Sequence, residues 1–532
     1  MKLSRFVLTI PLFLCFVFSS EDWIYIVGVH NGKGIIANLS LKILPGNGNV
    51  YISTSPLTKV DTQASARVAV RVACEIFNVN CSRYDFLFRI EGRGEIVGGP
   101  SAGAAMTVLA MGLLSNTTLR KDIIMTGTIN PDWSIGPVGG IKEKYLAAKE
   151  YASLFLIPYG EKTEEIESIE EKTKIIEVKD ALDAYKYFTE REIQIKIQKI
   201  NLTQINNLIK KAEVMVCKKA KSFEYLAKKP SDLLKKAREL EKKGKYYSAA
   251  SYCVRAIKEL YTKYLEENIE NIENEVQEMR NEIKNLSKKR LTYDPNSLEL
   301  VFIFLDRLYE ANESLNEGVE SRDIEKIAGA KARIISAEAW LSLIPPGKWV
   351  FDEDQYIGCS RDAIERAEIG VIYASTYYTG GPVAEAKSKI EKARELLERG
   401  KAVRALFLSK EAEVLSELAL ENLEDKEKVF EKYQELLDKR IRFYVSQNYY
   451  PILALLYKEY SSVLWEEDKN AAIYFAKLAL KMSSLPSEIK HTKLSPKIIE
   501  VRKETAKKLL TIPLALLLFL CFLGVLIYLG KI

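Results

Sequence analysis

Residues 98–103 read Gly98-Gly99-Pro100-Ser101-Ala102-Gly103 and stand between a β-rich run and a helical pattern. A serine at the start of a helix and among glycines has an accessible hydroxyl, and the backbone N–H groups around it are unpaired. Such N–H groups can stabilise an oxyanion, which makes this stretch a candidate nucleophile loop. A tight turn with Ser101 as a helix N-cap explains the same residues equally well.

A candidate base follows 43 residues after this serine. The next blocks are Met125-Thr126-Gly127 and Gly139-Gly140-Ile141-Lys142-Glu143-Lys144. A lysine takes a proton from a serine hydroxyl only when its amine is neutral, and burial lowers the lysine pKa toward that state. Lys144 precedes apolar residues of a predicted helix, so it is a candidate base that needs no histidine. A solvated start of a helix is the alternative.

The composition excludes several other kinds of chemistry. The chain has 532 residues, 47% of them hydrophobic, which predicts about three compact units with buried cores. The net charge of +6 arises from 78 basic and 72 acidic side chains and gives no argument for nucleic-acid binding. His30 and His491 are the only histidines, so a site built from several histidines is excluded. We expect no cofactor, no metal and no nucleic-acid partner.

β-rich runs alternate with helical patterns between residues 21 and 190, which predicts an α/β domain. Strands are expected at residues 23–29, 35–43, 50–53, 86–91, 123–127, 154–158 and 175–178. Helices are expected at residues 62–77, with Asp61 as N-cap, and at 102–114, 141–151 and 181–188.

Residues 191–508 are rich in Lys, Glu, Leu and Ala at helical spacing, which predicts an all-α region. Breaks at residues 345–347 and 380–382 leave open whether it forms two bundles or one bundle with a long crossover. Gly244 and Gly400 are each followed by alanines spaced seven apart, which resembles tetratricopeptide hairpins. The copies are irregularly spaced, so an antiparallel bundle is favoured over a regular array.

Both ends of the chain carry apolar segments. Residues 1–20 have the basic flank, short apolar stretch and small residues of a secretory signal, and a retained anchor is the alternative. Residues 509–530 are uncharged and apolar, and as a helix they would span roughly 33 Å, which predicts a transmembrane helix.

The charges beside these segments bear on the orientation. Lys2 and Arg5 favour an N-terminus inside the cell, whereas the basic residues between 502 and 508 favour the opposite orientation of the last helix. Because the first segment usually dominates, we expect a single-pass protein of the cell membrane, after signal cleavage, with the α/β domain and the helical region outside the cytoplasm. That location would allow a disulfide between Cys74 and Cys81, although ordinary buried thiols explain them equally well.

Three blocks of the chain, in order and in spacing, resemble the proteolytic domain of the Lon family, especially its archaeal membrane-associated members. They are Gly99-Pro100-Ser101-Ala102-Gly103, Met125-Thr126-Gly127 and Gly139-Gly140-Ile141-Lys142-Glu143-Lys144. Weaker similarity extends from Gly28 to about Phe188, so the resemblance covers roughly the first third of the chain. It implies a Lon-type α/β protease domain over residues 21–190.

The resemblance implies roles for single residues. Ser101 would be the nucleophile, Lys144 its general base and Thr126 the hydrogen-bonding residue that orients the lysine. The turn and the oxyanion site would be formed by Gly98, Gly99 and Pro100. Lon-type domains commonly assemble into rings, so a homo-oligomeric ring is implied as well.

The chain also departs from the family pattern. Gly98 stands where bacterial members usually have Asp, and Thr128 stands where they usually have Glu, so substrate alignment or regulation is expected to differ. Most Lon proteases carry an ATPase domain, but no Gly-x4-Gly-Lys-Ser/Thr loop occurs in these 532 residues. Proteolysis is therefore expected to be independent of ATP.

These observations together predict a membrane-anchored serine endopeptidase that uses a Ser101–Lys144 dyad on unfolded or membrane-associated polypeptides. Two alternatives are a catalytically silent Lon-like scaffold, which the departures at Gly98 and Thr128 would suit, and a protease that processes only itself.

Overall fold

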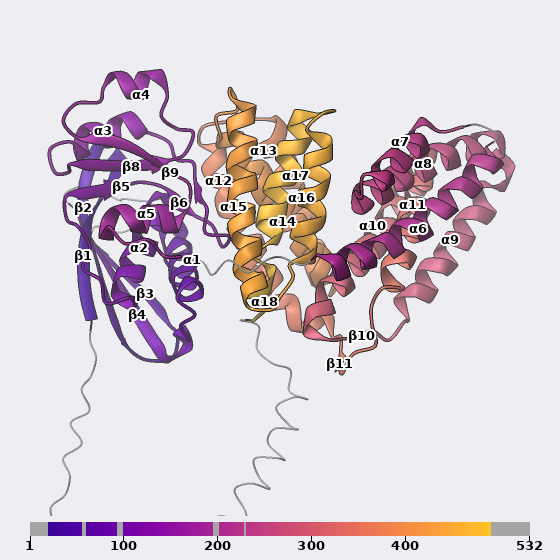
Figure 1. The fold of residues 1–532 in the computed structure, drawn as a ribbon, viewed down its shortest axis with the longest axis horizontal. Helices are drawn as coiled ribbons and strands as arrows, with labels where there is room; N and C mark the ends of the chain where they lie inside the picture. The colour runs from indigo at the N-terminus through magenta and orange to yellow at the C-terminus, as the bar shows by residue number, and fades with distance from the viewer. Residues whose placement is uncertain (1–19, 56–59, 93–98, 195–201, 228–229, 491–532) are drawn as a thin grey trace, which may run out of the picture.

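The computed structural model describes residues 20–55, 60–92, 99–194, 202–227 and 230–490, and it shows an α/β domain followed by a large helical region (Figure 1). The predicted signal segment, apart from Ser20, and the predicted transmembrane helix at residues 509–530 lie outside these ranges. Within the described ranges, no helix is both long enough and apolar enough to cross a membrane.

The α/β domain is built on a mixed seven-stranded sheet with the order β3-β4-β2-β1-β5-β8-β9. Strands β1, β2 and β4 pair antiparallel, whereas β3 is parallel to β4, and β5, β8 and β9 continue from β1 in parallel. The strands are β1 (Ser20–His30), β2 (Lys33–Pro45), β3 (Val50–Ser55), β4 (Tyr84–Gly92), β5 (Ile123–Met125), β8 (Leu154–Pro158) and β9 (Lys174–Val178). All seven coincide with predicted strands.

Helices cover both faces of this sheet, because alternate apolar residues of the strands point to opposite sides. Helices α1 (Val60–Ile76), α2 (Gly103–Leu114) and α5 (Ala181–Thr189) pack in one hydrophobic core with β1, β2 and β4. Helices α3 (Ile141–Ala148) and α4 (Glu164–Ser168) pack in a second core on the other face. A small hairpin, β6 (Thr128–Ile129) with β7 (Ile135–Gly136), was not predicted, because two-residue strands leave no alternating pattern.

The helical region extends away from the α/β domain in two groups of helices, with α12–α18 beside that domain and α6–α11 beyond them (Figure 1). One continuous core joins the two groups. The bounds are α6 (Thr203–Leu226), α7 (Asp232–Lys242), α8 (Tyr246–Glu267), α9 (Ile272–Ser287), α10 (Leu298–Ser321), α11 (Ile324–Leu341), α12 (Ile357–Ser375), α13 (Gly381–Glu398), α14 (Ala402–Leu420), α15 (Lys426–Ser446), α16 (Ile452–Leu464), α17 (Lys469–Met482) and α18 (Leu485–Lys490).

The region is not helical throughout, since β10 (Thr292–Tyr293) and β11 (Trp349–Val350) form a short antiparallel ribbon. The residues before β11 include the predicted break at 345–347.

Two disulfides are present among the described residues. The bond between Cys74 and Cys81 is one of the two alternatives that the sequence left open. The bond between Cys217 and Cys253 joins α6 to α8 and was not predicted. Residues 36 apart on different helices give no sequence signal that they meet.

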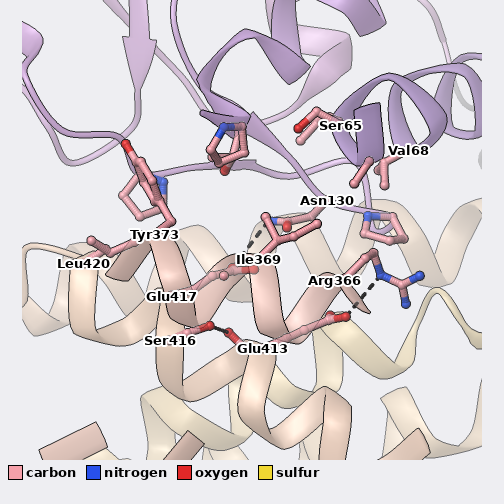
Figure 2. A pocket seen from close by; sticks show the side chains of 17 residues that line it. Ser65, Val68, Asn130, Arg366, Ile369, Tyr373, Glu413, Ser416, Glu417 and Leu420 are labelled. Carbon is pink, nitrogen blue, oxygen red and sulfur yellow. Dashed lines mark hydrogen bonds and ion pairs between the residues drawn. The ribbon is translucent and has the colours of Figure 1, made fainter. Parts of the chain in front are cut away.

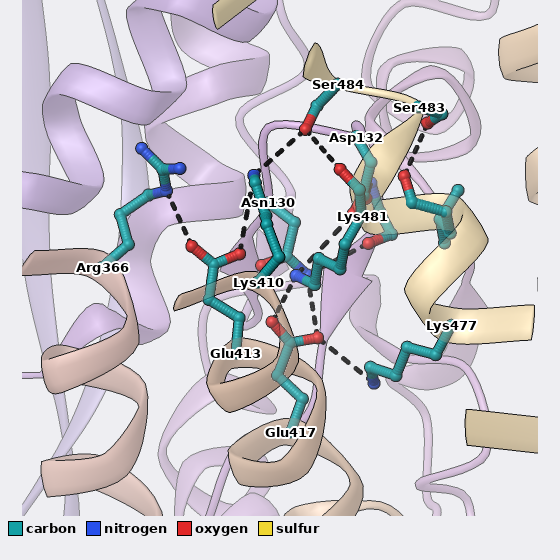
Figure 3. Close-up of polar contacts among 12 residues, drawn as sticks. Asn130, Asp132, Arg366, Lys410, Glu413, Glu417, Lys477, Lys481, Ser483 and Ser484 are labelled. Atoms are coloured by element: carbon teal, nitrogen blue, oxygen red, sulfur yellow. Dashed lines mark hydrogen bonds and ion pairs between the residues drawn. The ribbon is translucent and has the colours of Figure 1, made fainter. Parts of the chain in front are cut away.

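Buried charges join the α/β domain to the helical region, and Figure 3 shows one such cluster. Asp132, between β6 and β7, lies 3.7 Å from the amine of Lys481 on α17, which also pairs with Glu417 on α14. The amide of Asn130 reaches the same glutamate at 3.4 Å. Removing one partner of a buried pair leaves an uncompensated charge, so these contacts hold the two parts in a fixed relation.

Candidate active site

Ser101 lies in a short 3-10 turn, Pro100–Ala102, that leads into α2. Gly99 before it has φ of 125°, a conformation that favours glycine. The Ser101 carbonyl accepts a hydrogen bond from Gly127 N at 2.9 Å, and Ala104 N donates to the Gly127 carbonyl at 3.1 Å. The serine turn is therefore fixed to the end of β5. Ser101 does not cap α2, whose N-cap is Ala102.

Asp61 holds the same turn from the other side. It was predicted as the N-cap of the first helix, but α1 begins at Val60 and Asp61 lies in its first turn. Its Oδ1 accepts the N–H of Gly99 at 3.1 Å. This role was not predicted, because an acidic residue at a helix start is usually explained by capping.

This bond bears on the predicted turn and oxyanion residues, Gly98, Gly99 and Pro100. The N–H of Gly99 is occupied by Asp61, and Pro100 has no N–H to offer. Gly98 lies outside the described residues. Gly99 and Pro100 thus shape the turn, while an oxyanion would need N–H groups at Ser101 or beyond.

Lys144 projects from α3 into the domain and is only 3% exposed. Its amine donates a hydrogen bond to Thr126 Oγ1 at 3.1 Å, and Thr126 directly follows β5. Burial lowers the pKa of Lys144 to about 7, against the opposing effect of the negative charges of Glu161 and Glu143. Near neutral pH a large fraction of this amine is therefore unprotonated and able to accept a proton.

Ser101 and Lys144 line one cavity of about 100 Å³. Its walls include Val29 of β1, Thr54 of β3 and Tyr373 of the helical region. Among the described residues, the amine of Lys144 is hydrogen-bonded to Thr126 and not to Ser101. The fold therefore brings the predicted nucleophile and the predicted base into one cavity without closing a bond between them.

A second cavity, of about 80 Å³, lies between the α/β domain and the helical region (Figure 2). Pro100, Ser65 and Ile129 line it from the α/β domain, and Arg366 and Glu417 line it from the helical region. Tyr373 lines both cavities. Residues more than 200 positions after Ser101 therefore shape its surroundings, and nothing in the sequence pattern pointed to them.

The chain is similar to known proteins over part of its length. Residues 38–187 match the family model described as the Lon protease (S16) C-terminal proteolytic domain. This match covers most of the α/β domain and none of the helices from α6 onward.

Similar proteins include several bacterial Lon proteases. That of Flavobacterium johnsoniae is 31% identical over 144 residues, which cover 27% of this chain and 16% of that protein. The Lon protease of Phenylobacterium zucineum is 32% identical over 152 residues, which cover 26% of this chain and 19% of that protein. Lon protease 2 of Syntrophobacter fumaroxidans is 38% identical over 109 residues, which cover 20% of this chain and 14% of that protein. This chain spans less than a fifth of the length of these relatives.

Proposed function

We propose that this protein is a Lon-type serine endopeptidase in which Ser101 is the nucleophile and Lys144 is the general base. The observation that carries the proposal is the buried Lys144 amine, with a pKa near 7 and a hydrogen bond to Thr126, in the same cavity as Ser101. The similarity of residues 38–187 to the Lon proteolytic domain supports the same chemistry.

The proposed reaction has two stages. Lys144 takes the proton of the Ser101 hydroxyl as its oxygen attacks the peptide carbonyl carbon, and the protonated lysine then gives that proton to the leaving amine. Breakage of the C–N bond leaves an ester on Ser101. Lys144 next deprotonates a water molecule that attacks this ester, and the proton returns to the Ser101 oxygen as the acid product leaves. Thr126 acts as a positioning residue, because its hydroxyl holds the amine of Lys144.

Membrane anchoring and independence from ATP are part of this proposal. The apolar residues 509–530 support an anchor of the archaeal membrane-associated type, and the lack of a phosphate-binding loop in the chain supports proteolysis without nucleotide. Disulfides persist in oxidising compartments, so the two bonds support an extracytoplasmic location. The substrates would be unfolded or membrane-associated polypeptides. A homo-oligomeric ring rests on the family resemblance, and native mass spectrometry would measure the subunit number.

Hydrolysis of an unfolded fluorescent casein by the detergent-purified chain, without nucleotide, tests the proposal. Ser101→Ala and Lys144→Ala should each abolish cleavage. Lys142→Ala is the matched control, because Lys142 lies on the same helix but is exposed and pairs with Glu165 at 2.7 Å. Equal activity in the Ser101→Ala chain and the wild type would overturn the assignment, and a wild type without activity would favour the silent scaffold.

A further inference from the structure

The C-terminal end of α12 reaches the cavity that holds Ser101 and Lys144. Tyr373 and Tyr377, four residues apart, both line that cavity, and their ring centroids are 5.5 Å apart. These side chains come from the helical region, which lies outside the match to the Lon proteolytic domain. Part of the lining of the cavity therefore comes from outside the residues that match the Lon proteolytic domain.

Tyr373 contacts the loop that begins the lysine helix. Its hydroxyl accepts a hydrogen bond from Gly139 N at 2.8 Å, and α3 begins two residues later at Ile141. Burial raises the pKa of Tyr373 above its usual value, so this hydroxyl stays neutral over the whole working pH range. Tyr373 thus ties the helical region to the segment that carries Lys144.

Tyr377 packs directly on Gly139. A Cβ atom on this glycine would overlap Cζ and Oη of the tyrosine ring. The backbone of Gly139 is not left-handed, so the glycine is needed here for space and not for conformation. The tyrosine ring therefore fills the volume beside the loop, although half of its surface, 50%, remains exposed.

Apolar residues of the sheet also line the cavity. Ile26, Val27 and Val29 of β1 face it together with Ile90 of β4. The remaining space is about 100 Å³, which is small beside the roughly 300–1,000 Å³ of ordinary ligand sites. A substrate side chain next to the scissile bond has to fit between these strands and the tyrosines.

We propose that the two tyrosines form the specificity-determining wall of the proposed protease, with Tyr373 positioning the Gly139 loop and Tyr377 limiting the side chain next to the scissile bond to small residues. This inference rests on the proposed peptidase function. It assigns to the helical region a direct part in substrate selection.

Mapping of cleavage sites tests the wall. The intact chain is incubated with unfolded casein, and the products are identified by mass spectrometry for the wild type, Tyr377→Ala, Tyr377→Phe and Tyr378→Ala. Tyr378 is the matched control, since it is 52% exposed and does not line the cavity. Tyr377→Ala should accept Phe and Leu beside the cleaved bond, with kcat/KM for such peptides rising roughly 10-fold relative to Ala peptides. The other two variants should keep the small-residue preference.

The contact between Gly139 and Tyr377 allows a rescue experiment. Gly139→Ala should displace the half-exposed ring of Tyr377, because the added methyl group overlaps it, and so lower kcat/KM for Ala peptides. Tyr377→Ala in the same chain should remove that difference. Tyr373→Phe should raise KM several-fold with little change in kcat or in the pH profile, because it frees Gly139 N without touching Lys144. If the double variant is no better than Gly139→Ala alone, the proposed packing is wrong.

The two possible failures are distinguishable. If the wild type neither cleaves casein nor reacts at Ser101 with a fluorophosphonate, the proposed peptidase function is wrong, and so is the proposed role of the two tyrosines. If the wild type cleaves casein but Tyr377→Ala and Tyr378→Ala give the same cleavage map, the peptidase function is supported and the proposed role of Tyr377 in specificity is refuted.

Discussion

The amine of Lys144 on α3 and the hydroxyl of Thr126, which directly follows β5, are joined by a hydrogen bond of 3.1 Å, and both residues are buried. The bond gives the lysine a fixed direction inside an environment that lowers its pKa to about 7.

Thr126→Val should remove the acceptor with little change of shape. A buried polar group that loses its partner costs about 1–3 kcal/mol, so kcat/KM for casein peptides should fall roughly 10-fold to 100-fold. Thr126→Ser keeps the hydroxyl and should retain most of the activity. Steady-state kinetics measure both variants, and equal loss in Val and Ser would show that the methyl packing matters instead of the hydroxyl.

The activity should rise with pH through about 7, because the free base of Lys144 is the reactive form. On a logarithmic plot kcat/KM should increase with a slope of one below that pH and level off above it. A profile that is flat between pH 5.5 and 8.5 would contradict the assignment.

The same pKa shift affects stability. Between about pH 7 and 10.5 the unfolded chain binds a proton at Lys144 that the folded chain does not, so this group makes the free energy of unfolding increase with pH over that window. In denaturant titrations across this range, the free energy of unfolding of the wild type minus that of Lys144→Met should rise with pH. Parallel curves would show that the lysine is not buried as described.

Asp61 should support activity without touching the substrate, because its carboxylate accepts the N–H of Gly99 beside Ser101. Asp61→Ala frees this N–H and loosens the turn, so kcat/KM should drop roughly 10-fold, in line with the 1.5–3 kcal/mol of a hydrogen bond to a charged group. Asp61→Asn keeps a hydrogen-bond acceptor, so its kcat/KM should lie between those of the wild type and Asp61→Ala. A thermal midpoint measured in parallel separates loosening of the turn from general unfolding.

Arg440 should be critical for the attachment of the helical region. It is 1% exposed, lies 3.2 Å from Glu75 of α1 and stacks on the ring of Trp133. Arg440→Met leaves the Glu75 carboxylate without its cation, which should lower the free energy of unfolding by about 3 kcal/mol. Differential scanning calorimetry and limited proteolysis measure the effect. The exposed Arg442→Met serves as control, and an equal thermal midpoint in both variants would contradict a structural role for the pair.

The sequence predicted most of the α/β domain, since alternating apolar residues in β2 and β4 mark one buried face. The resemblance of three glycine-rich blocks to the Lon family pointed to Ser101, Thr126 and Lys144 as site residues. The catalytic roles of these residues stay predictions. Asp61, Tyr373 and Tyr377 were missed for one physical reason, which is that their contacts join residues 38 or more than 200 positions apart. Such contacts leave no periodic signal in the chain.

The buried ion pairs between the α/β domain and helices α15 and α17 have a consequence for biosynthesis. The ribosome delivers Asp132 and Glu75 hundreds of residues before Lys481 and Arg440. Until the last helices emerge, these carboxylates lack the cations with which they pair in the complete chain. Tyr373 and Tyr377 are then not held against Gly139. An unfinished chain would therefore carry Ser101 and Lys144 without the completed cavity, so synthesis itself would delay the proposed proteolysis until the helical region has docked.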